Sequence, residues 1–283
     1  MKFAGVVVLY NPDEEVNKNI SSYLNAIEKL YVIDNSSEDN SKKIMKDKKI
    51  EYIPLYDNKG IAKALNTGCE KALENNFDYI LTMDQDSNFE NDDIIKFIDF
   101  VKKNKEEKIA IFTPFHRFGH EIKKPEEEVD YPFEVMTSGN LVSLNAYKDV
   151  GGFKDWLFID CVDIEFCMNL RKNGYEICRY NEIELIHHLG NTESVDLKIK
   201  KIIVYNQNYI RRYYITRNLL YMYNLYHDTF PEYSTWLKDN VKFQTRNVIL
   251  FEKDKFRKIR NVWRGIRDYK KNIKGKYPYK TQE

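Results

Sequence analysis

The chain has 283 residues, of which 42% are hydrophobic and 31% are charged, and its formal net charge is +1. This balance predicts a folded protein with one large core or two smaller ones, and it excludes a disordered chain. The first apolar run soon reaches Pro12 and acidic residues, which does not fit a signal peptide, and no run of about 18 apolar residues predicts a membrane-spanning helix.

The four cysteines show no C-x-x-C spacing: they are Cys69, Cys161, Cys167 and Cys178. This pattern favours reduced thiols over a disulfide framework. We therefore expect a cytoplasmic protein.

Short apolar runs alternate with helical patterns up to residue 114. The run at 3–10 is apolar without alternation, which predicts a strand buried on both faces. Further strands are predicted at 29–35, 50–56, 78–84 and 108–114, and helices at 16–27, 58–76 and 91–104, with a polar helix start at 36–47. Strands that alternate with helices predict the α/β class, with a mostly parallel sheet flanked by helices.

Polar residues follow each of the first four predicted strands. An isolated D-x-D is more often a turn than a site, because Asp, Ser and Asn are common turn residues. Here the polar ends come in succession, and in parallel sheets such ends meet at one edge, where ligands bind. No glycine-rich dinucleotide fingerprint and no P-loop pattern follows the first strand, which disfavours NAD. The four ends are Tyr10-Asn11, Asp34-Asn35-Ser36, Asp57-Asn58-Lys59-Gly60 and Asp84-Gln85-Asp86.

The composition changes near residue 190. From Asn191 onward the chain has 21 Lys and Arg against 9 Asp and Glu, and 11 of its 21 tyrosines. The pattern predicts a basic, aromatic, helical tail after an acidic body. Three interpretations stay open for the tail: a helical cap on the body or a dimer contact, an amphipathic surface on an anionic membrane, and nucleic-acid binding. No recognised nucleic-acid motif accompanies it, so we expect no nucleic acid.

Eight short motifs occur in order along the chain: VVLYNP, VIDNSS, NKGIAKALNTG, MDQDS, TSGNLVS, GGF, FIDCVDIEFC and HHLGN. Together they resemble glycosyltransferase family 2, which has the GT-A fold, and within it the bacterial rhamnosyltransferases that build cell-surface polysaccharide. The resemblance covers about residues 3–195, with a weaker echo at YYITRN. It implies a Rossmann-like GT-A domain at 1–195, followed by the helical C-terminal region at 196–283.

The resemblance implies an inverting glycosyltransferase. Its donor would be a dTDP- or UDP-sugar, with L-rhamnose from dTDP-rhamnose as the leading candidate, and its acceptor a hydroxyl of a glycan or of a lipid-linked saccharide. Such an enzyme would be cytoplasmic or peripheral on the inner face of the cell membrane, and a homodimer is possible for it. Two rivals are a sugar nucleotidyltransferase and a non-catalytic nucleotide-sugar-binding module. The first would show a glycine-rich basic loop after the first strand, and LYNPDEEVN lacks one.

The resemblance also implies a nucleotide-sugar site at the strand ends. Asp34 would accept from the ring N–H of uracil or thymine, although a cap for the following helix is the alternative. Asp84 would contact the ribose or the metal shell. The other residues implied to bind the nucleotide sugar are Tyr10, Asn58, Gly60, Asn66 and Asp86.

A divalent cation, Mg²⁺ or Mn²⁺, is part of the same implication. Asp86 would coordinate it, with Asp84 beside it and His187 as a third contact. Carboxylate oxygens suit such ions, which stabilise the charge on a departing diphosphate. The alternatives are a solvated turn for the two acids and an ordinary core or surface role for the histidine.

A second acidic cluster precedes an apolar helical pattern. Acids in a first helical turn suit the helix dipole, which is one interpretation of Asp160, Asp163 and Glu165. The resemblance implies that Asp163 is the catalytic base, with Asp160 as the next candidate, since an inverting transferase needs a base for the acceptor hydroxyl. Related sequences often have Arg where Asn169 stands, which leaves the charge partner of Glu165 open, with Arg171 as a candidate.

Residues on the acceptor side are implied as well. Gly139 and Asn140 of TSGNLVS would line that side of the site, and Trp156 would stack on a sugar face. No disulfide, dinucleotide or nucleic-acid chemistry is needed for this interpretation.

Overall fold

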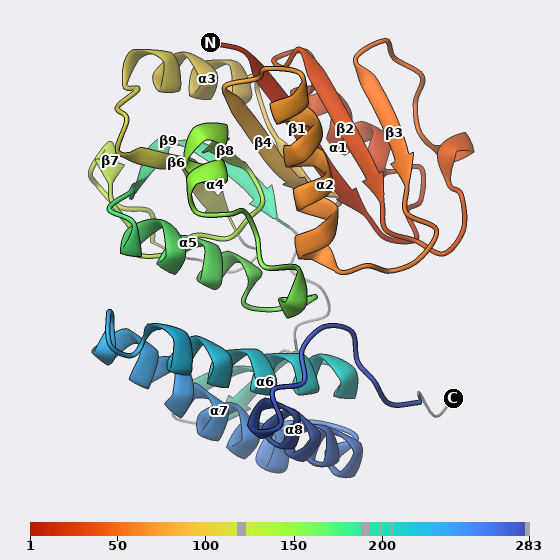
Figure 1. Cartoon of the computed structure of the whole chain (residues 1–283), viewed down its shortest axis with the longest axis vertical. Coiled ribbons are helices and arrows are strands. Elements are labelled where there is room, and N and C mark those ends of the chain that lie inside the picture. Colours follow the sequence, from red (N-terminus) through yellow and green to blue (C-terminus); the bar gives the residue numbers. More distant parts are fainter. Residues whose placement is uncertain (118–122, 188–192, 198–199, 205, 281–283) are drawn as a thin grey trace. The chain divides into compact units, whose positions relative to one another are not determined.

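Figure 1 shows a computed structural model of the chain, coloured from red at the N-terminus to blue at the C-terminus. It describes residues 1–117, 123–187, 193–197, 200–204 and 206–280, with side chains described for all of these outside 187–204. The chain forms two compact units. The first comprises Met1–Asp155 and Val162–His188, and the second comprises Trp156–Cys161 and Leu189–Glu283.

The strands of the first unit form one sheet. Their bounds are β1 (Phe3–Leu9), β2 (Lys29–Asp34), β3 (Ile50–Pro54), β4 (Tyr79–Asp84), β5 (Ser87–Phe89), β6 (Ile109–Arg117), β7 (Val129–Asp130), β8 (Asn140–Ser143) and β9 (Glu176–His187). Among the described residues the order is β3-β2-β1-β4-β8-β6-β9-β5, with β7 paired to β9. The pairs within β3-β2-β1-β4 are parallel, whereas β8 runs antiparallel to both β4 and β6. The strands β6 and β9 also pair in parallel, whereas β5 and β7 run antiparallel to β9. The α/β class with a mostly parallel sheet is therefore confirmed.

Helices follow the predicted strands. The first unit contains α1 (Val16–Leu24), α2 (Ile61–Glu74), α3 (Asp93–Lys103), α4 (Leu144–Asp149) and α5 (Val162–Lys172), together with the 3₁₀ turn η1 (Ser41–Lys43). The predicted helices at 16–27, 58–76 and 91–104 therefore form. The helix start at 36–47 gives only the short turn η1, because that turn has no buried residue to hold it against the sheet.

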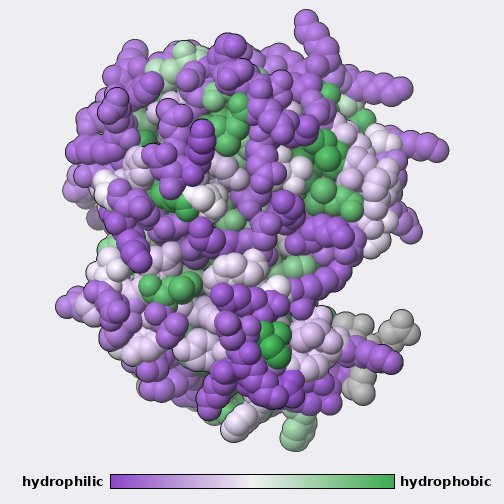
Figure 2. Space-filling view, in the orientation of Figure 1, coloured by the Kyte–Doolittle hydropathy of each residue, from purple (hydrophilic) through white to green (hydrophobic). Residues whose placement is uncertain are grey.

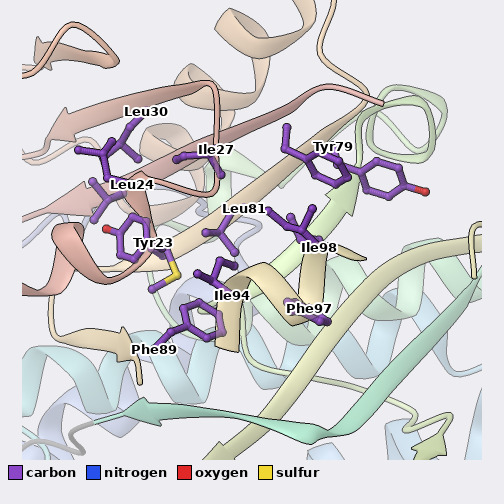
Figure 3. Packing of buried hydrophobic residues seen from close by; sticks show 14 of the residues in the cluster. Tyr23, Leu24, Ile27, Leu30, Tyr79, Leu81, Phe89, Ile94, Phe97 and Ile98 are labelled. Carbon is purple, nitrogen blue, oxygen red and sulfur yellow. The ribbon is translucent and has the colours of Figure 1, made fainter. Parts of the chain in front are cut away.

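The main core lies between the sheet and helices α1 and α3. Alternate residues of β1 and β4 point to this face, and they pack against Tyr23 of α1 and Phe97 of α3. Figure 3 shows Leu81 of β4 among the side chains of α1 and α3. Every residue of β1 is buried, as expected for a strand that is covered on both sides.

Helix α2 covers the other face of β1 and β2, and Figure 1 shows it crossing that face. Gly68 makes this close approach possible, because a Cβ at that position would lie 2.3 Å from Cγ2 of Val6. The strand ends at which the predicted site lies are thus held between helices on both faces.

The second unit contains a hairpin and three helices. These are β10 (Glu193–Leu197) and β11 (Lys200–Val204), which are antiparallel, and α6 (Tyr209–Tyr226), α7 (Pro231–Phe251) and α8 (Lys255–Lys270). The helical tail is as expected, whereas the sequence pattern does not predict the hairpin. Gly265 lets α8 approach α6 closely, since a Cβ there would lie 2.8 Å from the Tyr213 carbonyl oxygen.

Within the part of the chain that the structure describes, no helix is both long and apolar enough to cross a membrane. All four cysteines lie in that part, their side chains are buried, and none forms a disulfide. Burial raises the pKa of the Cys178 thiol to about 12, so this thiol stays protonated at neutral pH.

Candidate active site

Hydrogen bonds join the ends of neighbouring strands at the carboxyl edge of the parallel half of the sheet. Gln85, the middle residue of D-Q-D, accepts a hydrogen bond from the Tyr10 backbone N–H with its side-chain oxygen, at 2.8 Å. Its backbone carbonyl accepts one from the Asn19 side chain, also at 2.8 Å. The turn after β4 is therefore held to the end of β1 and to α1.

The same joining continues along the edge. The Asn11 N–H donates to the Ser36 hydroxyl at 2.7 Å, which links the ends of β1 and β2. The Asn35 amide donates to Oδ1 of Asn58 at 3.1 Å, and its own oxygen accepts from the Lys59 N–H at 2.8 Å. Four strand ends predicted to form a site are thus connected by side-chain hydrogen bonds.

Gly60 lies between β3 and α2 with φ +90°, a conformation that side-chain-bearing residues rarely adopt. Its N–H donates to Oδ1 of Asn58 at 3.0 Å. The same oxygen accepts from the Asn35 amide, so Asn58 holds both the start of α2 and the side chain of Asn35. The predicted pair Asn58 and Gly60 lies together at the edge of the sheet.

Asp34 is completely buried at the end of β2. Its carboxylate accepts hydrogen bonds from the Ser36 N–H at 3.1 Å, from the Asn40 side chain at 2.9 Å and from the Tyr52 hydroxyl at 2.5 Å. Burial by itself would raise the pKa of Asp34. The hydrogen bonds to its carboxylate together outweigh the effect of burial, so the pKa lies below its ordinary value. Because Asp34 has no exposed surface, neighbouring groups would have to move before a nucleobase N–H could reach its carboxylate.

Asp84 and Asp86 flank the turn that follows β4. Asp86 is exposed, and Asp84 is half-buried at the strand end. The Asp84 N–H donates to the Ser138 hydroxyl at 3.1 Å. One acid is therefore anchored through its backbone, and the other lies on the solvent side of the turn.

His187 is the last residue of β9, and its backbone pairs with that of Ser87 in β5, directly after Asp86. Its side chain lies outside the described residues. Among the side chains that are described, no three His, Cys, Asp or Glu residues are grouped to hold a metal ion.

The ligand atoms that this turn offers nevertheless suit a hard divalent cation. Both acids offer carboxylate oxygens, which Mg²⁺ and Mn²⁺ prefer, and such ions commonly bind through one or two carboxylates together with substrate phosphates. Among the described residues at this edge of the sheet, Asp84 and Asp86 offer the carboxylates that could hold such an ion together with substrate phosphates.

Gly139 and Asn140 lie beside β4 at the start of β8. Gly139 has φ +83°, and its N–H donates to the Thr82 carbonyl at 2.7 Å. Asn140 is 2% exposed and donates to the Met136 carbonyl at 2.6 Å. The Asn140 side chain is therefore packed inside the first unit rather than presented on its surface.

Asn66, implied to pass beside the nucleoside, is held by the segment that follows α4. Its amide donates to the Phe153 carbonyl at 2.7 Å and to Asp155 at 2.6 Å. Its oxygen accepts from the Tyr147 hydroxyl at 2.8 Å and from the Phe153 N–H at 3.0 Å. These four bonds use the whole hydrogen-bonding capacity of the amide, so the structure shows Asn66 fixing that segment.

Asp163 lies in the first turn of α5, half-buried, with Oδ1 2.9 Å from the Ile164 N–H. Arg171, the candidate partner of Glu165, instead donates through Nε to the Phe133 carbonyl at 2.8 Å. Asn169 donates to the Val150 carbonyl at 3.0 Å.

Trp156 and Asp160 belong to the second unit. The Trp156 ring makes an edge contact with Tyr221 at 5.1 Å, and the Lys274 ammonium lies 4.6 Å from its centre. Asp160 pairs with Nε of Arg211 at 3.0 Å. The family resemblance implied both residues for the domain at 1–195, whereas the structure groups them with the residues of the second unit.

Sequence reasoning did not single out four residues that shape the site: Asn35, Tyr52, Gln85 and Ser138. Asn35, Gln85 and Ser138 lie inside recognised motifs, whereas Tyr52 lies outside them in the predicted strand at 50–56. Each of the four acts on a residue far away in the chain. The polar ends of the strands were the available signal for Asn35 and Gln85, whereas nothing local marks Tyr52 as the partner of Asp34.

The sequence model of the family described as "Glycosyl transferase family 2" matches residues 6–148. The protein is 30% identical over 234 residues to "dTDP-rhamnosyl transferase RfbF" of Shigella flexneri, which covers 75% of this chain and 77% of that protein. It is 28% identical over 155 residues to a UDP-N-acetylglucosamine--dolichyl-phosphate N-acetylglucosaminyltransferase of Methanococcus voltae, covering 48% of this chain and 58% of that one.

Solved structures share the fold. S. aureus TarS (residues 1–349), in complex with UDP-GlcNAc, superposes with a TM-score of 0.60 at 13% identity, covering 96% of this chain and 83% of the other. GalNAc-T7 with UDP, GalNAc and Mn²⁺ superposes with a TM-score of 0.55 at 11% identity, covering 66% of this chain and 44% of the other.

Proposed function

The chain belongs to glycosyl transferase family 2 and is a glycosyltransferase of GT-A fold, and we propose that it is an inverting enzyme that uses a nucleoside-diphosphate sugar. The observation that carries this proposal is the connected edge of the sheet, where Asp84 ends β4 and Asp86 lies two residues beyond it, with hydrogen bonds from this turn to the end of β1 and to Ser138 before β8. The domain at 1–195 would perform the transfer, and the region at 196–283 would support it.

The leading donor is dTDP-L-rhamnose. The similarity to a protein described as a dTDP-rhamnosyl transferase over three quarters of the chain supports this choice. A UDP-sugar is the next candidate, and the acceptor would be a hydroxyl of a glycan or of a lipid-linked saccharide in cell-surface polysaccharide synthesis.

In this proposal the strand ends hold the nucleotide. Tyr10 is 51% exposed at the end of β1 and offers a ring to the base. Asn58 and Gly60 would present backbone to the nucleoside, and Asp34 would accept from the base N–H once neighbouring groups have moved. Asn66 would act indirectly, because its amide holds the segment after α4.

Asp163 would be the base. As the acceptor oxygen forms a bond to C1 of the donor sugar, the bond from C1 to the diphosphate oxygen breaks on the opposite side. The acceptor proton passes to the Asp163 carboxylate, and the configuration at C1 is inverted. Asp160 is the second candidate, and Gly139, Asn140 and Trp156 would contribute to the acceptor side.

Asp84 and Asp86, with His187 as a third contact, would hold Mg²⁺ or Mn²⁺. When bound, such an ion supplies positive charge to the diphosphate as it leaves. Asp84 is fixed by its backbone bond to Ser138, so its carboxylate starts from an anchored position.

We further propose that α8 contacts an anionic membrane on the cytoplasmic side. Phe256 is 94% exposed and Trp263 is 69% exposed, seven residues apart on one side of α8. The helix contains seven Lys and Arg residues, while its one acid, Asp268, has no exposed surface. Exposed aromatics among cations are typical of helices that lie in a membrane interface.

A homodimer through the same face is the rival arrangement. A two-fold dimer would place this face against its own copy, so cations would meet cations, and anionic lipid is therefore favoured. On the side seen in Figure 2, hydrophilic residues cover most of the surface, and smaller apolar patches are scattered among them.

The test of the proposed function is a panel of nucleotide sugars, including dTDP-L-rhamnose and UDP-GlcNAc, incubated with the full chain and Mg²⁺ or Mn²⁺. Release of nucleoside diphosphate from one donor is the expected result, and a β-linked product from an α-linked donor (or the reverse) establishes inversion. Formation of a nucleotide sugar from a sugar phosphate would instead identify a nucleotidyltransferase. Donor binding without release under any condition would identify a binding module.

A further inference from the structure

The segment Trp156–Cys161 holds an unusual backbone conformation. Three residues in it that carry side chains have positive φ: 70° at Phe158, 63° at Asp160 and 63° at Cys161. Side chains larger than hydrogen disfavour this region, so each residue costs conformational free energy. Such a run persists only where surrounding contacts impose it, and it is commonly found at functional sites.

Asn218 of α6 imposes much of this conformation. Its side-chain amide lies within hydrogen-bond distance of three carbonyls of the segment, at 3.0 Å from Leu157, 2.8 Å from Ile159 and 2.9 Å from Asp160. An amide has only two N–H groups, so the three carbonyls share them. The carbonyls converge on one side chain because the backbone curls around it.

Arg217 holds the start of the same segment. The side chain has no exposed surface, and Nη2 donates to the carbonyls of Trp156 at 3.3 Å and Leu157 at 3.2 Å. Nη1 donates to the Gly275 carbonyl at 2.7 Å and to the Tyr213 hydroxyl at 3.3 Å. All of these acceptors are uncharged oxygens. The charged guanidinium is therefore buried against backbone carbonyls and one hydroxyl, and none of these partners is a carboxylate.

The position of Arg217 is supported from α8. The Tyr213 hydroxyl donates to the buried carboxylate of Asp268 at 2.9 Å, which places a negative charge one hydroxyl away from the guanidinium. The guanidinium carbon also lies 5.1 Å from the centre of the Tyr214 ring, on which Phe158 stacks at 5.1 Å. Burying an arginine is costly unless its hydrogen bonds are satisfied, and this arrangement satisfies them.

Asp160 is held at both its backbone and its carboxylate. Asn218 binds its carbonyl, and Arg211, one turn earlier in α6 than Tyr214, pairs with its carboxylate at 3.0 Å. The Asp160 side chain is 11% exposed. Helix α6 therefore determines where this acid lies within the second unit, and the chain continues from Cys161 into α5 with Asp163.

We propose that Arg217 and Asn218 are positioning residues for the acidic motif of the transfer reaction, an inference that rests on the proposed function. They hold Trp156–Cys161 in its strained form before the acceptor binds, which fixes Asp160 within the second unit, two residues before α5 with Asp163 begins. In this proposal the Tyr-Tyr-x-x-Arg-Asn pattern of α6 acts through its contacts with the backbone of this segment, and neither Arg217 nor Asn218 touches substrate. A loop that was free to relax would present its acids in several arrangements, and few of these would be productive.

The experiment compares Asn218→Asp and Arg217→Lys with Arg212→Lys. Asn218→Asp keeps the shape but removes both N–H donors. Arg212 is the matched control because it is a buried arginine on the same helix that binds Gln244 at 2.6 Å and Glu252, outside the segment. We expect kcat for transfer to fall about 10- to 100-fold in both test variants with the donor KM nearly unchanged, since small misplacements of reacting groups have effects of this size.

A second readout does not depend on sugar transfer. Hydrogen exchange at the amides of 158–161 should accelerate in Asn218→Asp and Arg217→Lys, but not in Arg212→Lys. Unchanged exchange in the test variants overturns the proposal, even if no donor is ever found. Faster exchange with kcat equal to that of the control also overturns it, because the segment would then be held for stability alone. A wild-type chain that transfers no sugar counts against the proposed function, and the exchange data still decide whether Arg217 and Asn218 hold the segment.

Discussion

The Ser138 hydroxyl accepts a hydrogen bond from the Asp84 backbone N–H at 3.1 Å, across 54 residues of sequence. Asp84 is the last residue of β4, and Ser138 precedes β8, which runs antiparallel to it. The bond joins the two motifs that carry the donor side and the acceptor side of the proposed site. Since Ser138 is 1% exposed, water does not readily replace it.

Ser138→Ala should lower turnover by about 10-fold or more, because a misplacement near 1 Å can cost about 10²-fold. The free energy of unfolding should fall by about 0.5–1.5 kcal/mol for the lost hydrogen bond. Ser143→Ala is the matched control, since Ser143 caps α4 at the other end of β8 and accepts from Ala146. It should lose about 1 kcal/mol of stability and keep its kcat. Equal kcat in the two variants would mean that Ser138 serves stability only.

Asp86→Ala should remove metal-dependent turnover while the fold stays intact, because the side chain is exposed and no core contact is lost. A bound cation stabilises the negative charge on the leaving diphosphate by several kcal/mol, so kcat is expected to fall by about 100-fold or more. Titration with Mn²⁺ measures the accompanying loss of metal affinity. Glu90→Ala, an exposed acid just beyond β5, is the control. Full activity of Asp86→Ala, or of the wild type in EDTA, would contradict the metal assignment.

Asp163→Asn should lower kcat for transfer by about 10²–10⁴-fold, since the amide cannot accept the acceptor proton. The donor KM should hardly change, because the proposed nucleotide contacts lie at the strand ends. Asp160→Asn, measured at saturating donor, is compared with it. If Asp160→Asn is inactive and Asp163→Asn active, the base is Asp160, and full activity of both would leave only helix-start roles for the two acids.

Stability should depend on pH through Asp34. Its pKa is lowered in the folded state, so the unfolded chain binds the proton more readily. The contribution of Asp34 to the free energy of unfolding is therefore complete above its pKa in the unfolded chain, about 3.9. It disappears as the pH falls through its lower pKa in the folded protein. Tyr52→Phe removes the hydroxyl that donates to the carboxylate at 2.5 Å, so it should reduce stability at neutral pH and have a smaller effect in acid.

Urea unfolding of both proteins, from neutral pH to below the folded pKa of Asp34, measures this difference. Tyr31→Phe is the control on the neighbouring strand, because the Tyr31 hydroxyl donates to the uncharged Lys71 carbonyl at 3.3 Å. Its effect should not change with pH in the acid range. A pH-independent effect of Tyr52→Phe would show that the Tyr52 hydroxyl does not lower the pKa of Asp34 in the folded protein.

The double variant Phe256→Ser/Trp263→Ser should lose binding to vesicles of phosphatidylcholine and phosphatidylglycerol. Both side chains are largely exposed, so the fold and the transfer to a water-soluble acceptor should be unaffected. Tyr131→Ser is the control, as Tyr131 is a 55% exposed aromatic of the first unit. Co-sedimentation should also weaken in salt, since charges at the surface are screened. Loss of a dimer in ultracentrifugation, with vesicle binding unchanged, would favour self-association through α8.

Much of the first unit could be predicted from local pattern. The apolar run at 3–10 and its polar end are properties of neighbouring residues, and so is the helical spacing of 61–72. Burial on both faces follows from the absence of alternation, and the carboxyl edge follows from parallel order. The antiparallel course of β8 did not follow, because Asn140–Ser143 is too short to reveal its direction or its partner.

The sequence by itself therefore determined the α/β class, the polar ends of the strands and the motif D-Q-D. Only the tertiary structure decided what those residues contact. Asp34 accepts a hydrogen bond from Tyr52 on the neighbouring strand, and Asn218 donates to the Asp160 carbonyl, 58 residues away in the sequence. Periodicity reports which side of an element is apolar, whereas a hydrogen bond depends on a separation of about 3 Å between atoms that folding alone brings together.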